Sequence, residues 1–124
     1  MSGKGKGLGT TTRTVRPAVV RSTDHAVDLE TLCKAFLELK TPEECRLFLL
    51  DLCTPAEISA LTERWKIARL LAEGQLSYRE IHDRTGGSLA TITRVARFLK
   101  QEPHQGYRLV LEREKRKSRA RQKT

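Results

Sequence analysis

The chain has 124 residues, enough for one small core and too few for two. Hydrophobic residues make up 38% and aromatic residues 5%, so any core is built mainly from Leu, Ile, Val and Ala. No run approaches the roughly 20 apolar residues of a transmembrane helix. No apolar segment follows the basic N-terminus as in a secretory signal. We therefore expect a cytoplasmic protein that does not span a membrane.

The positive charge is distributed unevenly. Residues 1–27 carry five Lys/Arg against one acid, residues 28–76 six against nine, and residues 77–124 thirteen against five. These regions contribute +4, −3 and +8 to the net charge of +9. Two basic ends around a mildly acidic middle favour a polyanionic partner, either nucleic acid or an anionic membrane surface.

The three cysteines give no sign of a metal site. Cys33, Cys45 and Cys53 lie among apolar residues, at spacings that fit no zinc pattern. We expect buried free thiols in a reducing compartment, with no bound metal.

From Asp24 on, the sequence predicts a succession of helices and an all-α fold. Apolar residues at i, i+3 and i+4 mark a first helix that ends before TPEE (41–44) and a second that ends before TPAE (54–57). In each tetrapeptide Thr can cap, Pro suits the first helical position and Glu completes a capping box. A third helix runs to about Glu73, and Gly74 is placed to end it.

Residues 77–100 predict a helix-turn-helix. Ser77 and Glu80 form another capping box, which opens a short helix. Gly86 ends that helix where the chain must reverse, and Ser88 caps a longer helix to about Lys100. The spacing assigns the contact between the two helices to Ile81, Thr85, Leu89, Ile92, Ala96 and Leu99.

The other side of the second helix is predicted to face outward. It carries Ser88, Ala90, Thr91, Arg94 and Arg97. Short hydroxyl and methyl side chains at a helix N-terminus let the helix enter a DNA major groove, where Thr and Arg can bind base edges or phosphates. The alternative is an ordinary helical hairpin with a solvated basic face.

The stretch TPAEISALTERWKIARLLAEGQLSYREIHDRTGGSLATITRVARFLK resembles the Trp repressor superfamily. Over 26–113 the wider frame is closest to the TrpR-like YerC/YecD branch, and LATITR and TPEE…DLCTPAE are its most specific pieces. The resemblance implies a Trp-repressor-like helical bundle that forms an intertwined homodimer and reads a palindromic operator. The DNA-contacting positions it implies are Arg79, Leu89, Ala90, Thr91, Thr93 and Arg94, with Tyr78 and His82 at further positions that differ from the tryptophan-responsive repressor.

The resemblance also implies where a ligand would lie. In the tryptophan-responsive repressor two arginines sandwich the indole, and the matching positions here are Arg64 and Arg94. A glycine and a small hydroxyl residue that complete that pocket are replaced by Val95 and Phe98. Both replacements add bulk where the indole and amino group would lie. We therefore expect no tryptophan corepressor and no cofactor, and the sequence names no other effector.

The expected organisation is a disordered basic tail at 1–23, a TrpR-like helical domain at 24–114 and a disordered basic tail at 115–124, which could instead extend a last helix begun near Tyr107. The last thirteen residues hold seven Lys/Arg and two Glu. Such a run adds phosphate affinity that is sequence-independent and salt-dependent. The alternative is a solubilising tail.

The sequence thus predicts a bacterial, nucleoid-associated transcription regulator, a repressor, that binds double-stranded DNA as a homodimer. The alternative is a non-specific architectural nucleic-acid-binding protein that acts through its basic tails. An enzyme is not expected, because His25, His82 and His104 are scattered and lie near no plausible nucleophile.

Overall fold

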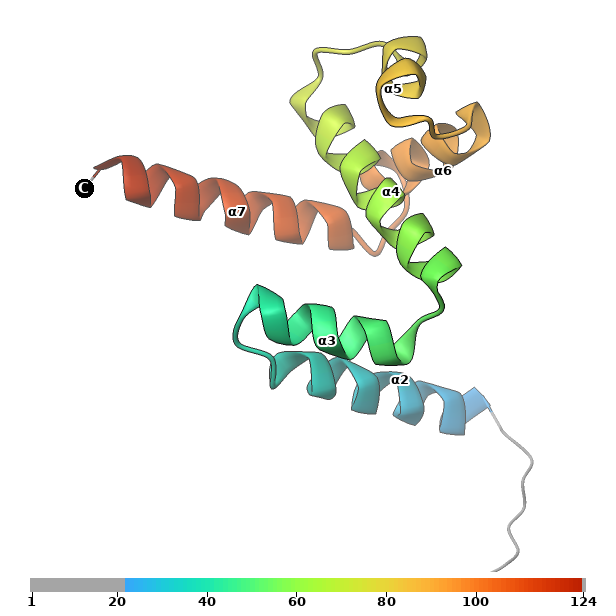
Figure 1. The fold of residues 1–124 in the computed structure, drawn as a ribbon. Helices are drawn as coiled ribbons and strands as arrows, with labels where there is room; N and C mark the ends of the chain where they lie inside the picture. Colours follow the sequence, from blue (N-terminus) through green and yellow to red (C-terminus); the bar gives the residue numbers. More distant parts are fainter. Residues whose placement is uncertain (1–21, 124) are drawn as a thin grey trace, which may run out of the picture. The chain divides into compact units, whose positions relative to one another are not determined.

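The computed structural model describes residues 22–123, which form six helices joined by short connections (Figure 1). The helices are α2 (Ser22–Leu37), α3 (Pro42–Leu52), α4 (Pro55–Glu73), α5 (Tyr78–Thr85), α6 (Leu89–Lys100) and α7 (Gly106–Lys123). No strand occurs in this part of the chain, so the prediction of an all-α fold is confirmed. The predicted tail at 1–23 lies outside the described residues, except for its last two, which begin α2.

The chain divides after Phe48 into two compact units. In the first, Phe36 of α2 meets Phe48 of α3 edge to face, with ring centroids 5.2 Å apart. The predicted Thr41 cap of α3 forms, since Glu44 N–H donates to Thr41 Oγ1. The Glu44 carboxylate accepts from Lys40 N–H instead of the Thr41 N–H that a capping box requires. No described side chain of this unit is fully buried.

The second unit is built around one core. Helix α6 packs against α4, α5 and α7, and α4 also packs against α5. Trp65 of α4 stacks on Tyr107 of α7, with centroids 6.3 Å apart, which fixes the first turn of α7. The buried side chains are Ile67, Ala68, Leu71, Ile81, Ile92, Val95, Ala96 and Leu99.

The predicted start and stop of α4 are confirmed. Thr54 Oγ1 accepts from Glu57 N–H, and the Glu57 carboxylate accepts from Thr54 N–H at 2.8 Å. At the other end Gly74 adopts the left-handed conformation with φ +74°, and its N–H donates to Leu70 O. A residue without Cβ takes this conformation without the steric cost that other residues meet.

Two expectations are wrong. Residues 115–123, expected as a disordered tail with an extension of the helix near Tyr107 as the alternative, continue α7 as a helix to Lys123. Glu112 and Glu114 precede Lys and Arg by three or four positions, an arrangement that supports a helix without apolar contacts. Cys33 is exposed rather than buried, because α2 and α3 enclose no buried side chain in the single chain; Cys45 and Cys53 are half-buried free thiols.

None of the helices in residues 22–123 is both long and apolar enough to cross a membrane.

Candidate nucleic-acid interface

Helix α5 begins at the predicted capping box. Ser77 Oγ accepts from Glu80 N–H at 3.1 Å, and the Glu80 carboxylate accepts from Ser77 N–H at 2.8 Å. The hydrogen bond from the Ser77 backbone is the main cause that lowers the pKa of Glu80, followed by the Ser77 hydroxyl and the positive charge of Arg84. The ionised form of Glu80 therefore fixes the start of the first helix of the pair.

The turn between α5 and α6 is closed by side chains. Thr85 Oγ1 donates to Ile81 O at 2.8 Å and accepts from Gly87 N–H at 3.0 Å. His82 Nδ1 lies 2.7 Å from Gly87 O. Because a carbonyl oxygen only accepts, Nδ1 carries the proton, and Nε2 is the acceptor of the neutral ring.

The structure explains why both positions of this turn are glycines. Gly86 ends α5 with φ +78°, as the sequence predicted. Gly87 is buried, and a Cβ built on it would lie 2.8 Å from Cδ1 of Ile67 in α4. The turn therefore sits directly on the core of its unit.

Helix α6 starts at Ser88, whose Oγ accepts from Thr91 N–H at 3.1 Å and lies 3.0 Å from Thr91 Oγ1. Its buried side faces the core through Ile92, Val95, Ala96 and Leu99. The residues predicted to contact DNA are exposed, apart from Thr91, which is half-buried. The exposed ones are Tyr78, Arg79, His82, Ser88, Leu89, Ala90, Thr93, Arg94 and Arg97.

Leu89 corrects one assignment made from spacing. It was expected in the contact between the two helices, but its side chain is 59% exposed. It is the first residue of α6 and precedes the first buried position, Ile92, by almost a full turn. Its exposure agrees instead with the position that the family resemblance implied.

An aromatic ring orders the arginines of α6. The Arg94 guanidinium lies over the Phe98 ring, 4.4 Å from its centroid, and the Arg97 guanidinium is 5.2 Å from the same centroid. Arg97 Nε also pairs with the Glu102 carboxylate at 3.3 Å. Cations stack on aromatic faces through the ring quadrupole. Phe98 thus occupies the space against the Arg94 guanidinium.

Of the four residues expected around a ligand, the structure brings Arg94 and Phe98 into contact. Val95 is 1% exposed and belongs to the core of the unit. Arg64 is half-buried on α4.

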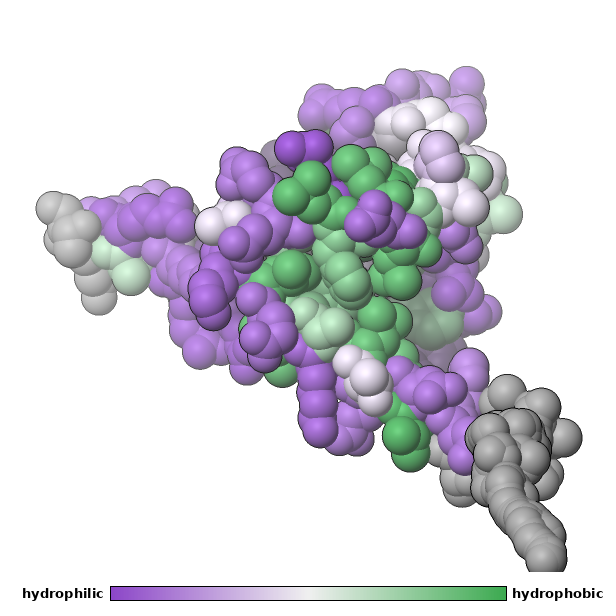
Figure 2. Space-filling model, turned by 60° about the horizontal axis from the view of Figure 1, so that its bottom comes forward, coloured by the Kyte–Doolittle hydropathy of each residue, from purple (hydrophilic) through white to green (hydrophobic). Residues whose placement is uncertain are grey.

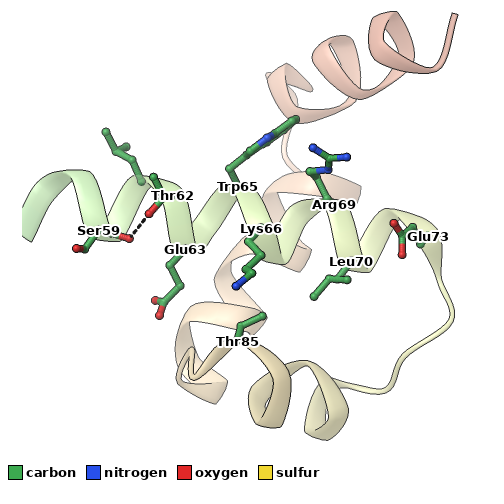
Figure 3. A pocket seen from close by; sticks show the side chains of 10 residues that line it. Ser59, Thr62, Glu63, Trp65, Lys66, Arg69, Leu70, Glu73 and Thr85 are labelled. Carbon is green, nitrogen blue, oxygen red and sulfur yellow. Dashed lines mark hydrogen bonds between the residues drawn. The ribbon is translucent and has the colours of Figure 1, made fainter. Parts of the chain in front are cut away.

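A groove of about 680 Å³ runs along α4 and ends at Thr85 (Figure 3). The side chains of Trp65, Lys66 and Arg69 project from α4 into this region, and Thr62 Oγ1 donates to Ser59 O within the helix. None of the four residues expected around a tryptophan lines this groove. Among the described residues, no three His, Cys, Asp or Glu side chains gather as a metal site would require.

The family model of the Trp repressor protein matches residues 27–115. The chain belongs to the Trp repressor family. It is 43% identical over 88 residues to the uncharacterized protein YerC of Bacillus subtilis, an alignment that covers 71% of this chain and 83% of YerC. The resemblance seen in the sequence is thereby confirmed.

Two solved structures share this Trp repressor family fold. A TrpR-like protein from Eubacterium eligens has a TM-score of 0.65 and 41% identity, covering 69% of this chain and 87% of its own. A Trp repressor candidate from Staphylococcus aureus has a TM-score of 0.67 and 33% identity, covering 77% and 95%. Family membership makes a DNA-binding regulator the coarse functional assignment.

Proposed function

We propose that the protein is a sequence-specific DNA-binding transcription regulator, a repressor, that reads a palindromic operator in double-stranded DNA through its helix-turn-helix. The observation that carries this proposal is the outward side of α6. It presents short hydroxyl and methyl side chains next to two arginines, while the opposite side is buried in the core. A helix with this profile fits a major groove.

The exposed residues divide into two kinds of contact. Ala90, Thr91 and Thr93 are short enough to approach base edges, and Arg94 can fork onto a guanine. Tyr78, Arg79, Ser88 and Arg97 contribute contacts to the phosphate backbone in this proposal. His82 offers Nε2 as an acceptor to a donor on a base edge, and Leu89 contributes an apolar contact. Backbone contacts fix register and base contacts give specificity.

The proposal needs no tryptophan corepressor and no cofactor. Phe98 already stacks on Arg94 at 4.4 Å, and Val95 is packed in the core. A ligand that had to insert against the Arg94 guanidinium would need to displace the Phe98 ring. We infer that this intramolecular contact holds Arg94 in a DNA-ready pose.

We also propose that the protein acts in the cytoplasm as an intertwined homodimer. The first unit leaves large apolar side chains open to solvent. On the face drawn in Figure 2, hydrophobic residues, in green, reach the surface of the molecule. Leu37 is 81% exposed, Val27 64% and Leu47 60%. Exposed apolar side chains in such numbers are typical of an interface. Assembly with a second copy would bury them and complete one helical domain over 24–114.

The test measures affinity for a selected operator duplex and for a scrambled duplex. Arg94→Ala and Thr91→Ala should each weaken operator binding by about 1–3 kcal/mol, roughly 5- to 150-fold. Arg46→Ala removes the same charge from α3 and should leave the preference for operator unchanged. Unchanged operator affinity in both α6 variants would overturn the assignment. Equal losses on both duplexes would favour the architectural alternative.

A further inference from the structure

Helix α7 has two sides of different charge beyond its anchored first turns. On the side that faces α4 and α6, a groove of about 670 Å³ is lined from α7 by Leu111, Glu112, Glu114, Lys115 and Ser118. Both acidic residues of the distal helix therefore lie on this inner side, where Arg69, Lys100 and Arg108 also line the groove.

The opposite side carries only positive charge. At 3.6 residues per turn, Arg113, Arg116, Lys117 and Arg121 follow one another at i, i+3, i+4 and i+8. All four are exposed, and none lines the groove. We call these four residues the basic stripe. It extends over about 12 Å of helix, since each residue adds about 1.5 Å.

The helical state of this segment bears on its role. Among the described residues beyond Leu111, no hydrophobic side chain of α7 packs on the core of the unit, and short helices without such packing are marginal in water. A solubilising tail would work equally well as a disordered chain. A helix adds one property, which is that it places these four positive charges along one side. Glu112 and Glu114 lie at its edges, one turn from Arg116 and two turns from Arg121 respectively.

We propose that the basic stripe binds the phosphate backbone of the double-stranded DNA whose bases α6 reads; this rests on the proposed function. A row of phosphates complements a row of guanidinium and ammonium groups, and the released counterions drive such binding. An anionic membrane is the weaker candidate. Between Arg113 and Arg121 the only apolar residue on this side is Ala120, whereas membrane-surface helices carry large apolar side chains.

The two sides of α7 offer a matched pair of variants for the full chain. Arg113→Gln with Lys117→Gln removes one Arg and one Lys at i, i+4 from the basic stripe. Lys115→Gln with Arg119→Gln removes the same charges at the same spacing from outside it. Each pair also deletes one Glu–Lys partner at i, i+3, so both should keep the same helix content by circular dichroism.

The measurement is the dependence of duplex affinity on salt between about 50 and 200 mM, for operator and scrambled duplexes. If both stripe residues of each protomer contact phosphates, the stripe variant removes four contacts from the proposed dimer. It should then lower the slope of log K against log salt by about 3.6, since each contact contributes about 0.9. Affinity should fall by the same factor on both duplexes, and the control variant should change the slope by less than half as much.

Three outcomes would overturn the proposal: no change in slope in either variant, equal changes in both, or a loss of binding to phosphatidylglycerol vesicles without a loss on duplexes. The second would mean that the helix acts as diffuse charge. If the proposed function itself is wrong, the unmodified protein will show no preference for the operator over the scrambled duplex, which distinguishes that outcome from the three above.

Discussion

The two compact units differ in how far a single chain can complete them. The second unit buries eight apolar side chains around α6, and its turn rests on that core through Gly87. The first unit buries none of its described side chains, although α2 and α3 carry apolar residues at helical spacing. The same kind of pattern therefore gives a finished core in one unit and an open surface in the other. In the proposed homodimer a second copy covers that surface.

The proposal that the first unit is a dimer interface is tested most directly at Leu37, which is 81% exposed. Leu37→Arg should convert the proposed dimer into a monomer at micromolar concentration, because a charge would have to be buried at the interface. Sedimentation equilibrium measures the mass. Helix content should be retained, since the side chain contacts little within its own chain.

The control for that variant lies on the other unit. Leu89→Arg places the same charge on a side chain that is 59% exposed on α6. It should alter DNA binding and leave the mass that of a dimer. If Leu37→Arg also remains dimeric, the open surface of the first unit is not the interface.

A second prediction tests the self-contained core of the second unit. Gly87→Ala should lower the free energy of unfolding by about 1–3 kcal/mol, because the added Cβ meets Ile67 Cδ1 at 2.8 Å. Gly106→Ala has no heavy atom within 4 Å of the new Cβ and should be neutral or slightly stabilising. Urea denaturation of the two variants measures the difference. Equal stabilities would mean that the turn does not rest on Ile67.

A third prediction concerns the cap that positions α5. Ser77→Ala should cost about 1 kcal/mol in the free energy of unfolding. Because the pKa of Glu80 is lowered in the folded state, its contribution is complete above the unfolded pKa near 4.3 and is lost as the pH falls through the folded value. Glu80→Gln should therefore flatten the decline of stability on acidification below that pH, measured by urea denaturation. An unchanged profile would contradict this role.

The smallest expected effect is at Phe98. Phe98→Leu removes the aromatic face on which Arg94 stacks, so operator affinity should fall by roughly 2- to 5-fold. This corresponds to the free energy of an exposed cation–π contact, about 0.5–1 kcal/mol. In an Arg94→Ala background the same substitution should have no effect on operator affinity. Additive losses in this cycle would mean that Phe98 acts by another route.

Local chemistry made much of this fold predictable. Thr54, Ser77 and Ser88 cap as their sequences indicated, and Gly74 and Gly86 end their helices in the left-handed conformation. Such signals depend on neighbours within a few residues, so they need no knowledge of the tertiary structure. The outward face of α6 was predictable for the same reason.

The burial of a side chain depends on residues far away in the sequence, so it was not predictable from spacing alone. On α4 helical spacing indicates one apolar side, made of Ile58, Leu61, Trp65, Ala68 and Leu71. Ala68 and Leu71 are buried, but Leu61 is exposed and Ile67, outside that spacing, is fully buried, because α5 and α6 pack on that part of the helix. The stacking of Arg94 on Phe98 could have been suspected from their i, i+4 spacing. The helical state of 115–123 could not be decided from the sequence, because the segment has almost no apolar residues from which a helical period can be seen.

The central claim is that this protein, without a corepressor, recognises a specific duplex through the helix-turn-helix of α5 and α6, which is fully formed before DNA binds. The most direct test is selection of bound duplexes from a random DNA pool by the purified protein, at about 0.15 M salt and with no tryptophan. We predict enrichment of a palindrome whose half-sites lie about one helical turn apart. No enrichment, together with binding that disappears as salt rises, would contradict the claim.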